Sequence, residues 1–289
     1  MSYSDNLKKG EKGAWISIIA YITLSFIKII IAKIGNSDAL FADGLNNASD
    51  VVASIAVLIG LKISRKPPDS DHPYGHYRVE SIASLFAAFI MAIIGLQVLM
   101  NTIGKLFNGS TTEPDLLTAW TALGAAVVMF AVYRYNLSLA KKIESSSLRA
   151  AAQDNKSDAL VSIGAFIGII GAQFGLFWLD PLAALIVGII ICKTAWDIFR
   201  DATHTLTDGF DEKELEVIKS SIAKVDEVKE VVDVKGRIHG NQALIDVTIL
   251  VDPNLNVLRS HEITEKIEDY LEKEHTLTHV HIHIEPYKK

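Results

Sequence analysis

The sequence predicts an α-helical membrane protein, with a six-transmembrane-helix bundle followed by a C-terminal cytoplasmic α+β domain. Two whole-chain observations support this fold class: 49% of the 289 residues are hydrophobic, and the mean hydropathy is +0.27. A soluble protein of this length seldom has so apolar a mean. Long apolar runs also stop near residue 207. We therefore divide the chain into a transmembrane domain, residues 1–207, and a cytoplasmic domain, residues 208–289.

The membrane spans follow from the apolar runs. A transmembrane helix needs about 20 mostly apolar residues. Runs that meet this need cover residues 14–34, 38–63, 80–106, 116–136, 147–176 and 181–206. Basic residues gather before the first run and in the connections 64–79 and 137–146. Because such residues favour the cytoplasmic side, we expect a multi-pass protein of the cell (plasma or inner) membrane, with both termini in the cytoplasm.

Charge and cysteine content exclude other classes of partner and site. The net charge of −6 argues against a nucleic-acid partner. The single cysteine, Cys192, allows no intrachain disulfide and no cysteine cluster for a metal. The lipid bilayer is therefore the partner that the composition itself predicts.

Beyond residue 207 the pattern becomes that of a small soluble domain. Helical periodicity predicts helices over residues 211–224 and 257–273. Alternation of apolar and polar residues predicts strands over residues 228–239, 243–251 and 278–285. The order α-β-β-α-β is typical of an α+β domain with an antiparallel or mixed sheet.

Four polar residues interrupt the second and fifth apolar runs. Asn46 and Asp50 are spaced i, i+4 in one run, and Asp154 and Asp158 in the other, so each pair shares a helix face. Each ionisable group at bilayer depth costs about 2.5–3.5 kcal/mol on insertion scales. Packing through hydrogen bonds would explain Asn46 alone, but not three carboxylates that repel one another. The oxygen donors predict a divalent-cation site within the membrane, and hence metal transport.

Two neighbouring charges leave alternatives open. Asp43 lies one turn before Asn46 and is either a further ligand or a group behind the ligands. Lys156 lies between the carboxylates of the fifth run, and helical geometry points it away from their face. At that depth it needs a carboxylate partner or a route to water.

The connection 64–79 contains ligand types for a second metal. His72 and His76, with either Asp69 or Asp71, lie in the segment D-S-D-H-P-Y-G-H and are suitable ligands for a transition metal. Pro73 and Gly75 in the same segment fit an ordinary surface turn equally well. The sequence leaves both interpretations open.

Histidines also alternate near the C-terminus. His279, His281 and His283 fall on one face of the last predicted strand, which ends at Glu285. They are either metal ligands or polar side chains that face solvent. The pattern alone does not choose between the two.

These features together resemble the cation diffusion facilitator family over nearly the whole chain. The stretches A-D-G-L-N-N-A-S-D (42–50) and Q-D-N-K-S-D (153–158) are similar to the family's motifs on its second and fifth helices. The resemblance implies three sets of metal ligands: the transport site Asn46, Asp50, Asp154 and Asp158, the loop site Asp69, His72 and His76, and a tail site of His261, His283 and Glu285.

The resemblance has further implications for the tail. It implies a homodimer formed through a metallochaperone-like domain, and a charge interlock between Arg78 and Asp208. Asp233 and Thr248 stand where some members of the family have histidines, which departs from the family's full tail site.

The donor set bears on the choice of metal. Zinc-transporting members commonly have a histidine at the position of Asp154, and a histidine or aspartate at that of Asn46, whereas oxygen donors occupy both positions here. Oxygen ligands suit manganese better than zinc, and the set resembles that of manganese-exporting members. We therefore expect a Mn²⁺/H⁺ antiporter that exports manganese, with Zn²⁺, Fe²⁺ and Co²⁺ open as substrates and no prosthetic group.

Two alternatives remain open from the sequence. One is a zinc or iron exporter of the same family. The other is a membrane-anchored metal sensor, although a sensor would not need ligands at mid-membrane depth. We do not expect an enzyme, because no Ser/His/Asp, Cys/His or phosphate-loop arrangement is visible in the sequence.

Overall fold

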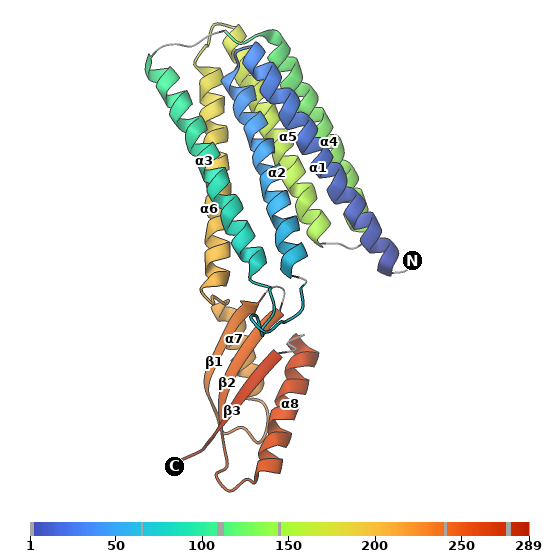
Figure 1. Ribbon diagram of the computed structural model, residues 1–289, viewed down its shortest axis with the longest axis vertical. Coiled ribbons are helices and arrows are strands. Elements are labelled where there is room, and N and C mark those ends of the chain that lie inside the picture. Colours follow the sequence, from blue (N-terminus) through green and yellow to red (C-terminus); the bar gives the residue numbers. More distant parts are fainter. Residues whose placement is uncertain are drawn as a thin grey trace. The chain divides into compact units, whose positions relative to one another are not determined.

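The computed structural model describes residues 3–64, 66–108, 113–143, 146–239, 242–275 and 279–288. The chain divides into two compact units (Figure 1). The bundle unit consists of Met1–Ala56 with Phe86–Ile198, and the tail unit of Val57–Leu85 with Phe199–Lys289. The tail unit therefore contains the connection between the second and third helices as well as the C-terminal elements.

Long helices occupy every predicted span. They are α1 (Tyr3–Ile34), α2 (Asp38–Ser64), α3 (Val79–Asn108), α4 (Leu116–Ile143), α5 (Ser146–Gln173) and α6 (Leu179–Leu206). Two helices extend well beyond the apolar runs, because helical hydrogen bonding continues through polar residues: α1 begins before residue 14, and α4 continues through most of the predicted connection 137–146. The fifth helix ends before residue 176, where Gly175 adopts a φ of 85° that favours glycine.

Five of these helices are long and apolar enough to cross a membrane by length and composition: α1 from Trp15, α2, α3 to Phe107, α4 to Lys142, and α6. Helix α5 is not among them, and its first half carries Arg149, Asp154, Lys156 and Asp158. It packs instead against α4 and α1. The contact face of α5 includes buried small residues, among them Ala152, Ala159, Ala165 and Ala172, and such residues let helices approach closely.

A buried carboxylate joins two helix ends within the bundle unit. Asp180, on α6, is 2% exposed. Its oxygens accept hydrogen bonds from the Ser37 hydroxyl (2.7 Å) and from the backbone N–H of Asp38 (2.7 Å), at the start of α2. A carboxylate at a helix N-terminus satisfies free N–H groups and complements the helix dipole. The connections α1–α2 and α5–α6 therefore lie at the same end of the bundle.

The predicted α-β-β-α-β order of the tail is confirmed. Its elements are α7 (Glu212–Ile222), β1 (Glu230–His239), β2 (Gln242–Val251), α8 (Val257–His275) and β3 (His279–Pro286). The sheet is mixed: β1 pairs antiparallel with β2, and β2 pairs parallel with β3. Thr278, predicted as the first residue of the last strand, lies outside the described residues.

One apolar core holds the tail elements together. Residues from α7, α8 and the sheet contribute to it: Ile218, Ile222, Val231, Ile245, Val247, Ile249, Val251, Ile263, Ile267 and Leu271. Val280, Ile282 and Ile284 of β3 pack against this core, whereas the alternating His279, His281 and His283 are exposed. The alternation of the last strand thus separates a core face from a histidine face.

Candidate metal centre

Asp158 of α5 is the residue on which three helices converge. It is 6% exposed. Its Oδ1 accepts a hydrogen bond from the Asn46 amide of α2 (2.9 Å), and its Oδ2 accepts one from the Tyr21 hydroxyl of α1 (2.8 Å). Both oxygens of this buried carboxylate are therefore held by donors from other helices, as a charge in a low-dielectric environment requires.

The remaining predicted ligands lie near Asp158 but are not gathered into a closed cage. The charge of Asp50 interacts with those of Asp158 and Asp154. Among the described residues, these three carboxylates do not form a group whose ligand atoms lie within 4.8 Å of one another. A cation would have to draw them together.

Solvent exposure differs among the four predicted transport ligands Asn46, Asp50, Asp154 and Asp158, which we call the quartet. Asp158 is buried, whereas Asp154, one turn earlier on α5, is exposed in the single chain. Asp50 Oδ2 is buried and accepts no well-aligned hydrogen bond from the described residues, although the Asn47 side chain interacts with this carboxylate. Lys156 is exposed, in line with the helical geometry that pointed it away from the ligand face.

The orientation of Asn46 matters for binding. In this arrangement its Nδ2 donates to Asp158, so its amide acts as a hydrogen-bond donor and not as a ligand. A half-turn of the amide exchanges Nδ2 and Oδ1. After that turn Asn46 would offer an oxygen to a cation that also contacts Asp158.

A chain of buried polar groups holds Tyr21 in place. The Tyr21 hydroxyl lies 2.9 Å from Asn155 Oδ1, and the Asn155 amide donates to Ser17 Oγ at 3.1 Å. The Asn136 amide of α4 donates to the same Ser17 Oγ at 2.9 Å. Because Ser17, Tyr21, Asn136 and Asn155 are all buried, the network orients the donor that meets Asp158.

A second buried network lies one helical turn from the quartet. Lys28 of α1 is 0% exposed. Its Nζ donates to Asn47 Oδ1 (2.7 Å) and to Ser162 Oγ (2.9 Å), and lies 2.9 Å from Asp43 Oδ2 in an ion pair. Asp43, which the sequence left as either a ligand or a group behind the ligands, is thus the partner of a buried lysine.

Close packing of α1 against α2 makes these contacts possible. At Gly44 of α2, a Cβ atom would lie 2.9 Å from Ile29 Cγ1 and 3.1 Å from the Lys28 Cβ. The Ser25 hydroxyl also donates to the Gly44 carbonyl at 2.9 Å. Glycine at this position lets the two helix backbones approach, because a larger side chain would meet these atoms.

The buried polar face of α1 was not predicted from the sequence. Ser17, Tyr21, Ser25 and Lys28 recur at spacings of three or four residues, so they share one face of the helix. All are buried, and each contacts α2, α4 or α5. The signal was available: Lys28 is a lone cation deep in an apolar run, which by default indicates a functional or paired group.

The loop residues form the tightest group of potential ligands. In the described part of the chain, Asp69, His72 and His76 are the group whose ligand atoms all lie within 4.8 Å. His72 Nδ1 lies 3.2 Å from Asp69 Oδ1, and His76 Nε2 lies 3.5 Å from Asp69 Oδ2. A hydrogen bond from the His72 backbone N–H lowers the pKa of Asp69, so this carboxylate is ionised at neutral pH and attracts a cation.

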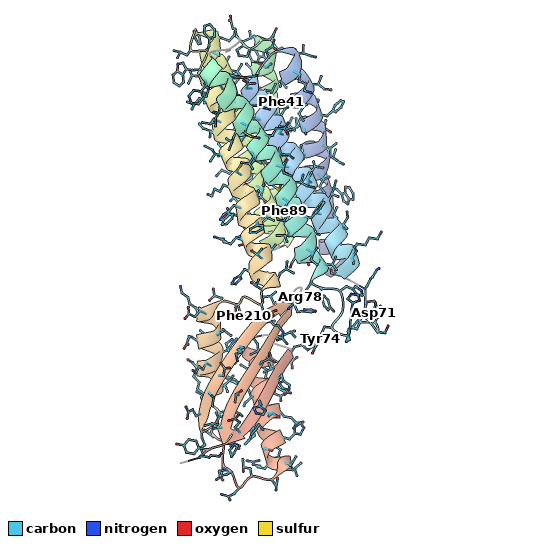
Figure 2. The ribbon with its side chains drawn as sticks, turned by 60° about the vertical axis from the view of Figure 1, so that its left-hand side comes forward. Phe41, Asp71, Tyr74, Arg78, Phe89 and Phe210 are labelled. Carbon is cyan, nitrogen blue, oxygen red and sulfur yellow. The ribbon has the colours of Figure 1, made fainter. Side chains whose placement is uncertain are left out.

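The loop is anchored within the tail unit. His239, at the end of β1, lies with its Nε2 3.0 Å from the Tyr74 carbonyl, and its ring centroid is 5.3 Å from that of Tyr77. The expected Arg78–Asp208 pair is present as an ion pair between Arg78 Nη2 and Asp208 Oδ1. Figure 2 labels Arg78, Tyr74 and Asp71 along this segment. The pair is exposed, so it contributes little stability by itself.

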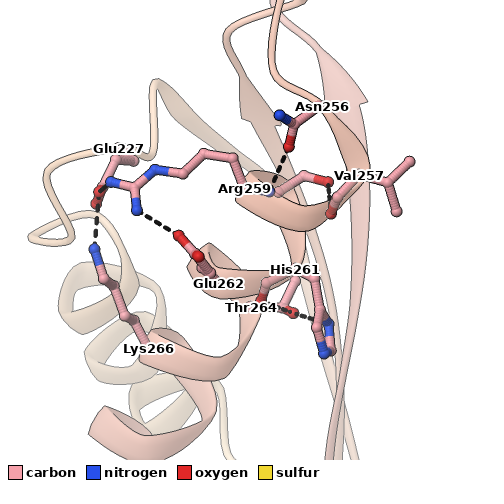
Figure 3. A network of polar contacts seen from close by, with 9 residues as sticks. Glu227, Asn256, Val257, Arg259, His261, Glu262, Thr264 and Lys266 are labelled. Atoms are coloured by element: carbon pink, nitrogen blue, oxygen red, sulfur yellow. Dashed lines mark hydrogen bonds and ion pairs between the residues drawn. The ribbon is translucent and has the colours of Figure 1, made fainter.

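The proposed tail ligands are not brought together within one chain. His283 Nε2 lies 3.6 Å from Glu285 Oε1 on β3, whereas His261 Nε2 lies 3.5 Å from Glu265 Oε1 on α8. Figure 3 shows His261 beside Thr264, next to a surface network of Glu227, Arg259, Glu262 and Lys266. All three tail residues are described, yet they form no group with ligand atoms within 4.8 Å.

Comparisons with known proteins show the family to which the chain belongs. Residues 14–207 match the family model "Cation efflux transmembrane domain", and residues 210–287 match "Cation efflux protein, cytoplasmic domain". The chain is 53% identical to the manganese efflux system protein MneS of Bacillus subtilis and 54% identical to its uncharacterized transporter YdbO, over 99% of each chain. It is 33% identical to the B. subtilis manganese efflux system protein MneP over 98% of both chains. The chain therefore belongs to the cation efflux family, the cation diffusion facilitators that export divalent metal ions across membranes.

Proposed function

We propose that this transporter exports Mn²⁺ from the cytoplasm in exchange for protons, through Asn46, Asp50, Asp154 and Asp158. The observation that carries the proposal is the donor set: three carboxylates and one amide on α2 and α5, with no imidazole or thiolate among them. Oxygen ligands suit manganese. Two relatives that match the chain along almost its full length are named manganese efflux proteins, which supports the same metal.

The contacts of Asp158 suggest how metal and protons exchange. In the structure, the N–H of Asn46 and the O–H of Tyr21 donate to the two oxygens of the Asp158 carboxylate. A cation that approaches from the exposed Asp154 would replace the Asn46 donor and draw in Asp50. Because metal binds deprotonated carboxylates, protons compete for the same oxygens and release the metal on the other side. Alternating access then requires the helices to rock around the site.

The proposed direction of transport depends on topology. We place the protein in the cell (plasma or inner) membrane with both termini in the cytoplasm, because basic residues gather on that side. The same topology puts residues 208–289 in the cytoplasm as a separate domain from the transmembrane residues 1–207. Export of zinc or iron remains the alternative of the same class, since affinity order alone does not select among transition metals.

We also propose a second metal site at Asp69, His72 and His76. The grouping of their ligand atoms within 4.8 Å supports it. His76 Nδ1 is buried and has no hydrogen-bond partner among the described residues, and Asp69 is ionised. A tail site at His261, His283 and Glu285 would need residues from two chains, because one chain does not gather the three.

Replacement of a charged ligand should stop transport. We expect Asp50→Ala and Asp158→Ala to lower Mn²⁺ flux in proteoliposomes by more than about tenfold, because each removes a ligand from a small donor set. Asp201→Ala, which removes an exposed carboxylate from α6, serves as the control and should keep its flux. Wild-type flux in either site variant would show that the quartet does not carry the metal.

Selectivity should respond to the donor at residue 154. We expect Asp154→His to raise zinc transport relative to manganese, because it exchanges an oxygen for an imidazole nitrogen. Competition between the two ions in flux assays, before and after the substitution, measures the change. An unaltered preference would place the selectivity elsewhere, such as at Asn46 or along the access route.

The Tyr21 hydroxyl should matter although it is not a predicted ligand. Groups that orient a metal ligand typically change metal affinity by roughly 10–100-fold when removed. We therefore expect Tyr21→Phe to raise the KM for Mn²⁺ by about tenfold, with the protein still folded. Tyr135→Phe removes the hydroxyl of an exposed tyrosine on α4 and should leave the KM unchanged. Equal KM values for the two variants would argue against a role for the Tyr21 contact.

We propose a homodimer formed through the tail domain, because twofold pairing is the commonest assembly and the resemblance implies it. Mass measurement in detergent should give twice the 31.6 kDa chain mass. A chain truncated before residue 208 should pair less well. A monomeric full-length protein would contradict the dimer and leave the transport proposal untouched.

A further inference from the structure

Asp43 is a buried carboxylate that the transport site does not use. It is 0% exposed and lies one turn before Asn46 on α2. Neither of its oxygens accepts a hydrogen bond from the described residues, so its contact with Lys28 at 2.9 Å is an ion pair without hydrogen-bond geometry. An ionised carboxylate with so few partners would be a ready ligand for a divalent cation.

Lys28 occupies the position that such a cation would take. Its Nζ meets oxygens of Asp43 and Asn47 on α2 and of Ser162 on α5. Ser162 lies one turn beyond Asp158, and Asp43 one turn before Asn46, so these contacts form a polar layer next to the quartet, on the side of the α1–α2 connection. The charges of Lys28 and Asp43 both act on Asp158, and that of Lys28 acts on Asp50.

We propose that Lys28 is an internal counter-ion that withholds Asp43 from the metal centre, and so determines how many carboxylates a divalent cation meets there. The inference rests on the proposed function of the quartet. With Lys28 in place, the cation meets Asp50, Asp154 and Asp158. Without it, Asp43 would add a fourth negative charge. Affinity of oxygen sites rises with the number of charged ligands, and a transporter needs a site that also releases its ion.

The inference gives the two partners opposite effects. Lys28→Gln frees Asp43 and should tighten Mn²⁺ binding by about tenfold. Asp43→Asn leaves the Lys28 charge uncompensated beside the site and should weaken binding by about tenfold. The double variant Lys28→Gln/Asp43→Asn removes both charges and should return the Kd to within about threefold of the wild type. A purely structural role for the pair would instead weaken binding in both single variants.

Mn²⁺ binding to the purified full-length protein, measured by equilibrium dialysis with metal quantification, tests these values. Each variant is compared with its own Asp50→Ala counterpart, so that metal held in the loop or tail is subtracted. Flux in proteoliposomes provides a second readout, in which tighter binding of Lys28→Gln should lower the KM and slow release at saturating Mn²⁺. Thermal unfolding of each variant reports whether the fold survives.

Failure of the inference can be told apart from failure of the proposed function. A wild-type protein without Asp50-dependent Mn²⁺ binding would overturn both. An Asp50-dependent site with the same Kd in all three variants would overturn only the role of Lys28. Breaking one partner of a buried ion pair is strongly destabilising, so Lys28→Gln could fail to fold. In that case Asp43→Asn and the double variant decide. Equal weakening of Mn²⁺ binding in both variants, or no weakening in either, would contradict the inference.

Discussion

A charge within a bilayer must find its partners inside the protein, and this constraint organises the helical bundle. No water is available there to replace a missing contact. Asp158 meets Asn46 and Tyr21, Lys28 meets Asp43, and Asp180 binds the start of α2. Each of these contacts joins residues on different helices. These buried polar contacts, which include the candidate metal ligands, therefore also tie α1, α2, α5 and α6 together.

Helix α1 contacts polar groups of both α2 and α5, the two helices that carry the candidate ligands. Its buried face presents a hydroxyl to Asp158 through Tyr21, and a positive charge to Asp43 through Lys28. A movement that changes access to the site would have to carry these contacts along or exchange them for others. Because the contacts are charge-assisted and buried, they favour a few discrete arrangements over continuous deformation. The candidate metal centre thus depends on contacts among three helices, α1, α2 and α5.

In the tail unit, unlike the bundle unit, polar and charged groups contribute little to the core. Its stability comes from an apolar core between two helices and a mixed sheet, and its charged residues stay at the surface, where ion pairs contribute little. The histidine face of β3 is therefore free to vary without disturbing the core. The loop triad belongs to the same unit, anchored through His239 and the Arg78–Asp208 pair. The loop that carries the candidate ligands Asp69, His72 and His76 is thus linked to the tail fold by short local contacts.

The sequence by itself determined the long helices and the α-β-β-α-β tail, because hydropathy and periodicity are local properties of the chain. The i, i+4 spacing, also local, predicted the four candidate ligands. It could not determine which polar groups meet across helices. Lys28 drew no interpretation from the sequence, and Asp43 was either a ligand or a group behind the ligands, until packing placed the two 2.9 Å apart. Packing likewise gave Asp158 its Tyr21 and Asn46 donors, gathered the loop triad, and left His261 apart from His283. The Asp158 contacts join residues more than a hundred positions apart, and the others depend on how helices and loops pack, which local sequence patterns do not determine.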